Sequence, residues 1–193
     1  MPTTPEENNF SPLTALLKKH QAAFGKVTDI DLDSASVTRL DLSAANPLLT
    51  LQNLRDTNLF GGVIEKMLRE KKATAGIGGY LENRVIYRRS QLFEEAEPRS
   101  LHLGIDIWAP AGTGVYAPLA ATIHSFQDNA AYGDYGPTLI LQHELEGTVF
   151  YTLSGHLDRA SLKNLKPGIT IAKGDKIAEF GPYPENGDWP PHL

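Results

Sequence analysis

The segment that decides the fold is residues 99–113, RSLHLGIDIWAPAGT. It sets His102 and Asp106 four positions apart, with Gly104 between them and a β-branched and aromatic run around Trp108. That run, followed by turn residues, favours a strand over a helix. A straight strand would hold the two side chains about 13 Å apart, too far for two ligands that each lie about 2 Å from one zinc ion. We therefore expect the backbone to bend at Gly104, where glycine permits it.

Two later segments add histidines to this pair. Residues 154–157, SGHL, contain His156, and residues 189–193, WPPHL, contain His192. Three histidines and one carboxylate suit a zinc hydrolase. An H-x-x-x-D pattern alone is a weak signal, so the hypothesis depends on the combination of the three segments. The other histidines are expected to be structural: His20, His124 and His143.

The composition excludes several classes of function. The chain has 193 residues and a net charge of −5, without a basic patch, so nucleic-acid binding has no support. The absence of cysteine excludes thiol catalysis, disulfides and cysteine zinc sites. No segment has the ~20 apolar residues that span a bilayer, and the first residues do not form a secretory signal. We expect no membrane association and a cytoplasmic location for the sequence as written, with export as the alternative.

Hydrophobic periodicity divides the chain into two regions. Apolar residues at helical spacing predict helices over residues 12–24 and 57–72, and residues 26–42 alternate as two short strands would. The glycine-rich residues 75–80 indicate a linker, which places a domain boundary at residues 78/79. Beyond it only residues 160–165 favour a helix, and the strand candidates are residues 80–93 (one strand or a pair), 104–108, 115–116, 121–126, 138–143, 149–154, 169–171 and 176–180.

Many short strands separated by turn residues are typical of an all-β barrel or sandwich. Two stretches, residues 111–123 and 165–177, each contain a glycine turn, a short strand, a tight turn and a second strand. The predicted fold class is therefore α+β. A mainly antiparallel β barrel or sandwich with a duplicated hairpin motif occupies residues 79–193, and a small mixed α/β region, residues 1–78, precedes it.

From residue 100 to residue 193 the chain resembles the lysostaphin-type (LytM-like) zinc endopeptidases. The resemblance rests on His102-x-x-x-Asp106, on the segment from Tyr151 to Gly155-His156-Leu157, on the hairpin of residues 166–177 and on the ending Pro-His192-Leu. It implies that His102 and Asp106 are zinc ligands. It also implies that His156 contacts the zinc-bound water or the oxyanion, and that His192, the first histidine of a terminal H-x-H motif, helps to activate the water. The implied activity is zinc-dependent hydrolysis of peptide bonds in peptidoglycan or similar peptides.

The sequence departs from this pattern at its end. The second histidine of H-x-H, the third zinc ligand, would stand at position 194, and the sequence stops at Leu193. We expect a fragment of a longer chain, or else a protein with weak or no catalysis. The alternative function is therefore a LytM-like binding or regulatory module with an incomplete metal site. Sugar phosphotransferase carriers share this style of barrel, but they require a second upstream histidine, and none lies between His20 and His102. The oligomeric state and the role of the first region stay open.

Overall fold

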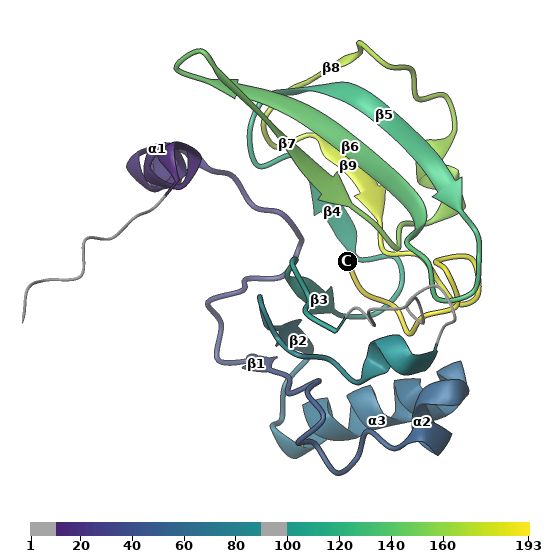
Figure 1. Ribbon diagram of the computed structural model, residues 1–193. Coiled ribbons are helices and arrows are strands. Elements are labelled where there is room, and N and C mark those ends of the chain that lie inside the picture. The colour runs from purple at the N-terminus through teal and green to yellow at the C-terminus, as the bar shows by residue number, and fades with distance from the viewer. Residues whose placement is uncertain (1–10, 90–99) are drawn as a thin grey trace, which may run out of the picture.

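The computed structural model describes residues 11–89 and 100–193, which form three sheets and a small group of helices (Figure 1). The α-helices are α1 (Pro12–His20), α2 (Leu51–Arg55) and α3 (Thr57–Glu70), and the short 3-10 helices are η1 (Gln21–Ala23), η2 (Ile86–Arg89) and η4 (Arg159–Leu162). The strands are β1 (Val37–Arg39), β2 (Ala75–Gly78), β3 (Asp106–Trp108), β4 (Gly114–Tyr116), β5 (Ala121–Asn129), β6 (Gly136–Leu145), β7 (Thr148–Ser154), β8 (Thr170–Ile171) and β9 (Lys176–Glu179). No helix among these described residues is long and apolar enough to cross a membrane.

The largest sheet is antiparallel, in the order β7-β6-β5-β8. A two-residue turn joins β6 to β7, with φ of 48° at Glu146 and 75° at Gly147. Two positive φ values fit the primed turns that match the twist of paired strands. The inward face of this sheet packs against the two-stranded β4-β9 sheet, so the first hydrophobic core lies between them. Its buried side chains include Ile123, Leu141 and Phe180.

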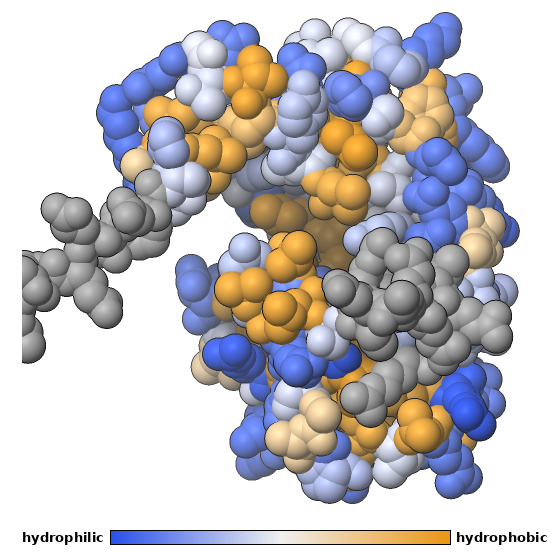
Figure 2. Space-filling view, viewed as in Figure 1, coloured by the Kyte–Doolittle hydropathy of each residue, from blue (hydrophilic) through white to orange (hydrophobic). Residues whose placement is uncertain are grey.

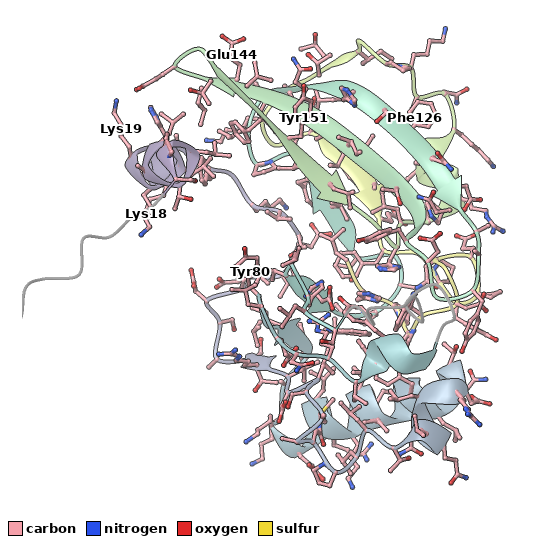
Figure 3. All side chains as sticks on the ribbon, in the orientation of Figure 1. Lys18, Lys19, Tyr80, Phe126, Glu144 and Tyr151 are labelled. Carbon is pink, nitrogen blue, oxygen red and sulfur yellow. The ribbon has the colours of Figure 1, made fainter. Side chains whose placement is uncertain are left out.

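The helices α1, α2 and α3 each begin at a side-chain cap that the sequence supplies. The Ser11 hydroxyl accepts a hydrogen bond from the Thr14 amide at 3.2 Å, ahead of Pro12 in the first turn of α1. Asp56 caps α3 in the same way. Lys18 and Lys19 project from α1 in Figure 3. The ammonium of Lys19 lies 2.6 Å from the carboxylate of Glu146, which connects α1 to the β6–β7 turn.

The predicted linker is wrong, because residues 75–78 form β2, the middle strand of the sheet β1-β2-β3. β2 runs parallel to β1 and antiparallel to β3, with Gly76 opposite Trp108 and Gly78 opposite Asp106. The glycines are there for packing. A Cβ at Gly76 would lie 2.6 Å from the side chain of Leu40. Glycine-rich sequence indicated flexibility, whereas in the fold it allows a side chain to lie directly against the strand backbone.

A second hydrophobic core connects the helices to β3. Phe60 of α3 is fully buried, and its ring meets Trp108 and Trp189 edge-on, at centroid distances of 5.7 and 6.3 Å. The hydroxyl of Thr57 donates to the carbonyl of Asp188 at 2.7 Å. Strand pairing and packing therefore cross residues 78/79, and the division into two domains there stays a prediction.

The α+β class is confirmed. No closed barrel is formed by residues 11–89 and 100–193, so the barrel or sandwich stays unconfirmed. The strands predicted from residue 104 onward are present, with small differences at their ends. Three local predictions differ. Residues 26–42 contain β1 and an isolated bridge at Thr28, residues 160–165 contain the end of η4, and residues 80–89 contain two isolated β-bridges and η2. Residues 90–93 of that last segment lie outside the described residues.

Candidate metal centre

His102 and Asp106 meet across a bend in the chain, as the sequence predicted. Their backbone leaves extended structure at Gly104 and enters β3 at Asp106. His102 Nε2 and Asp106 Oδ1 lie 3.2 Å apart. A Cβ at Gly104 would lie 3.2 Å from that same Nε2, so glycine leaves room for the imidazole. The bend replaces the separation of about 13 Å that a straight strand would impose.

Backbone carbonyls fix the orientation of three imidazole rings at this site. His102 Nδ1 lies 3.3 Å from the carbonyl of Gly79. His156 Nδ1 lies 2.8 Å from the carbonyl of Asn186, and His192 Nδ1 lies 2.8 Å from that of Pro190. A carbonyl oxygen only accepts, so each Nδ1 carries the proton and donates it. The Nε2 atom of each ring is then left for other partners, which is how metal-binding histidines are usually held, and that of His102 faces Asp106 Oδ1.

Asp106 is buried, and its two carboxylate oxygens have different partners. Oδ1 faces His102 and Oδ2 accepts from Nη1 of Arg84, which is 2% exposed. Burial works to raise the pKa of Asp106, but the hydrogen bond with His102 and the charges of His192, Arg84 and His102 outweigh it. The net effect holds the pKa of this carboxyl well below its usual range. Asp106 is therefore an anion and available to a cation.

His156 and His192 form the second pair of the site, with ring centroids 4.1 Å apart. His192 also stacks on Trp108 at 4.0 Å, with its ring nearly parallel to the indole. Burial lowers the pKa of His192 to about 3, and it also lowers the pKa of His156. Both rings are neutral near pH 7. Because Trp108 belongs to β3 together with Asp106, this stacking brings the histidine pair beside the ligand pair.

An unusual backbone conformation and a buried amide side chain support the histidine pair. His156 has a φ of 59°, a left-handed conformation that costs a residue other than glycine about 1–3 kcal/mol. Its neighbour Asn186 is fully buried, and its side chain bonds both the carbonyl and the amide of Trp189. The loop that carries Trp189 and His192 is thereby fixed, and the Asn186 carbonyl remains for His156.

The separation of His102 Nε2 and Asp106 Oδ1 fits two ligands of one zinc ion. Two donor atoms at 2.0–2.1 Å from a tetrahedral zinc lie about 3.3–3.4 Å apart, close to the 3.2 Å found here. A third histidine or carboxylate does not join them within residues 11–89 and 100–193. The pairing of β3 with the last residues shows where another ligand would fit.

Residues 192 and 193 pair with β3 as a further antiparallel strand. Trp108 lies opposite His192, and Ile107 and Leu193 exchange backbone hydrogen bonds of 2.9 and 3.0 Å. Figure 1 places the C-terminus in the middle of the molecule, near β3. In this register a residue one position beyond Leu193 would lie opposite Asp106, on the same face of the sheet. The register therefore puts that position on the side of β3 that carries Asp106.

Comparison with known proteins agrees with this geometry. A family model, peptidase family M23, matches residues 100–193, the segment that contains His102, Asp106, His156 and His192. The match covers just under half of the chain and shows similarity of residues 100–193 to peptidase family M23. The resemblance inferred from the motifs is thereby confirmed, and the M23 segment contains both pairs of the site. The individual roles of the four residues stay predictions.

Two solved structures have local similarity to this chain. One is a zinc-containing peptidase from Vibrio cholerae, 26% identical over 50% of this chain and 26% of its own, with a TM-score of 0.37. The other is assigned to peptidase M23 from Pseudomonas aeruginosa, 24% identical over 46% of this chain and 34% of its own, with a TM-score of 0.35. The chain thus spans about a quarter to a third of the length of these proteins. No curated protein matched it.

Several residues at the site were not identified from the sequence. Arg84 and Tyr87 precede the M23 segment; the Tyr87 ring lies 6.3 Å from His102, and burial raises the pKa of Tyr87 to about 12. Trp108 and Asn186 belong to the segment but carry no motif signal. Only Trp108 had a usable clue, since it follows Asp106 by two positions and so shares its face of the strand.

Proposed function

We propose that this protein is a zinc-dependent endopeptidase that hydrolyses peptide bonds in peptidoglycan-type peptides. The match of residues 100–193 to a peptidase family model supports a metallopeptidase function. The observation that carries the zinc proposal is the meeting of His102 Nε2 and Asp106 Oδ1, 3.2 Å apart, beside two neutral histidines.

In this proposal His102 and Asp106 hold the metal, together with a ligand that continues the strand of residues 192–193. When bound, zinc would supply Lewis acidity, polarising the scissile carbonyl and lowering the pKa of the attacking water. His156 and His192 present unprotonated Nε2 atoms near pH 7. These atoms can orient the water and accept its proton.

Exposed apolar side chains near His102 support a peptide as the substrate. Leu101, Leu103 and Ile105 are 55%, 71% and 54% exposed, on both sides of the ligand. Figure 2 shows hydrophobic surface around the recess between the upper sheet and the lower, helical part of the molecule. Tyr80 lies at the upper edge of that lower part and Tyr151 lies on the sheet, as Figure 3 shows. Apolar and aromatic surface with a few polar groups is typical of ligand sites.

The test compares three proteins: the 193-residue chain, its His102→Ala variant, and the chain with one histidine appended after Leu193. We expect zinc to bind the parent chain, to be lost in His102→Ala, and to bind more tightly when the appended histidine supplies a third ligand. The appended chain should hydrolyse peptidoglycan peptides, and a chelator should stop the reaction. If the appended chain folds and binds zinc but cleaves no peptide, the endopeptidase proposal is wrong, and the protein is instead a binding module.

A further inference from the structure

Arg84 is a buried guanidinium that contacts two carboxylates. Its Nη1 donates to Asp106 Oδ2, and its Nε donates to Glu82 Oε2 at 2.9 Å. The side chain of Arg84 is 1% exposed, against 11% for Asp106 and 10% for Glu82. A buried charge is tolerated only when it is paired and hydrogen-bonded. Arg84 meets this condition at Nε and Nη1, whereas its Nη2 is buried and makes no hydrogen bond to the described residues.

Glu82 and the backbone on either side of Arg84 are themselves held by hydrogen bonds. Glu82 Oε1 accepts a hydrogen bond of 3.0 Å from the backbone amide of Leu42. The backbone amide of Arg84 donates to Ser100 at 2.7 Å, and that of His102 donates to Glu82 at 3.0 Å. The chain on both sides of Arg84 is thus paired with the chain that leads to His102. Gly78 completes the arrangement, since a Cβ there would collide with Arg84 Nη2.

The two carboxylate oxygens of Asp106 therefore have different partners. Arg84 occupies Oδ2, so only Oδ1 is free to face His102 Nε2. A carboxylate whose second oxygen is held by a planar guanidinium cannot rotate without breaking a charge-assisted hydrogen bond. Held this way, the carboxylate would bind a metal through Oδ1 alone, the oxygen that faces His102 Nε2.

We propose that Arg84 is a positioning residue for the metal centre, which it orients through Asp106 while Glu82 anchors it. This inference rests on the proposed function of His102 and Asp106 as zinc ligands. Arg84 and Glu82 both lie before residue 100. The segment outside the M23 match therefore supplies part of the metal site.

The experiment measures metal affinity and ligand geometry on the full chain, without any activity assay. Zn²⁺ affinity is obtained by competition with a chromophoric chelator, and the absorption spectrum of bound Co²⁺ reports the ligand geometry. Three variants are compared. Arg84→Met removes the charge, and Arg84→Lys keeps the charge but loses the planar guanidinium that donates to two carboxylates. Glu82→Gln removes the negative charge that pairs with Arg84 Nε. Arg159→Met is the matched control, because Arg159 also pairs with a carboxylate, Asp128 at 2.8 Å, but on an exposed surface.

We expect Arg84→Met to bind Zn²⁺ about 10–100-fold more weakly, the usual effect of losing an outer-sphere partner. Arg84→Lys and Glu82→Gln should show smaller losses together with a changed Co²⁺ spectrum, and Arg159→Met should match the parent chain. Where Arg84→Met does not fold, by circular dichroism, the lysine and glutamine variants decide the question. Affinities within twofold of the parent and unchanged spectra in the folded variants would overturn this inference but leave the proposed function standing. If neither the parent chain nor the chain with a histidine appended after Leu193 binds metal, the proposed function is refuted, and this inference with it.

Discussion

Replacing Phe60 by alanine should destabilise both parts of the molecule at once. Phe60 is fully buried in α3, outside the M23 segment, and its ring touches Trp108 and Trp189 within that segment. A buried Phe→Ala change costs about 3–5 kcal/mol. The two edge-on ring contacts account for about 1–3 kcal/mol of this, at about 0.5–1.5 each. The remainder comes from lost burial and from the cavity. In a chain of this length the loss corresponds to a fall in Tm of about 6–20 °C.

The assay is urea unfolding followed by two probes. The chain has two tryptophans, Trp108 and Trp189, and both lie in the second hydrophobic core, so fluorescence reports this core. Far-UV circular dichroism reports the sheets and helices together. Both transitions should shift to lower urea by the same amount in Phe60→Ala. The control is Leu59→Ala on the same helix, where a side chain 48% exposed should change stability by less than about 0.5 kcal/mol.

Two results would refute this reasoning. A loss below about 1 kcal/mol would mean that Phe60 does not pack as described. A fluorescence transition that moves while the circular dichroism transition stays would mean that the helices and the β-rich part unfold independently. In that case the helices would not support β3.

Two further predictions concern the site itself. In metal-free protein, burial lowers the pKa of His192 to about 3, so as pH falls below about 6.5 the unfolded chain binds the proton first. Stability should therefore fall by up to about 1.4 kcal/mol per pH unit between pH 6 and pH 4. His192→Gln should reduce that slope in urea titrations, and an unchanged slope would contradict the burial of a neutral ring. Gly104→Ala should weaken Zn²⁺ binding several-fold, because the new Cβ lies 3.2 Å from His102 Nε2. Gly62→Ala in α3, where a Cβ meets nothing within 4 Å, should leave zinc affinity unchanged and stabilise the fold by about 0.5–1 kcal/mol.

Local rules were enough to predict that His102 and Asp106 lie close together. The distance argument required a bend between His102 and Asp106, and glycine at position 104 identified its place; both are confirmed. Strand positions from residue 104 onward followed from alternation and turn residues, since short-range sterics decide them. The proximity of His156 and His192 depended on the family resemblance, because no local pattern relates residues 36 positions apart.

Other features depended on packing that one segment of sequence does not contain. Residues 75–78 look like a linker, and only the neighbouring Leu40 explains why a buried strand needs glycine there. Arg84 gave no signal, because its partner Asp106 lies 22 positions further along the chain. An isolated arginine is normally a solvated surface residue. Its burial here follows from two carboxylates that only the folded sheet brings together.

The position of β3 explains why the site depends on the whole chain. One edge of β3 pairs with β2, and the other pairs with residues 192 and 193. Asp106 and His192 are therefore placed relative to each other by a backbone ladder, which is more rigid than a loop. A three-residue strand with only the two-residue partner would be marginal in water, so β2 is required to hold β3 in register. Residues 100–193 alone would lack β2, the ring of Phe60 behind Trp108 and the guanidinium of Arg84 on Asp106. The region before the M23 segment is thus part of the scaffold that forms the candidate metal centre.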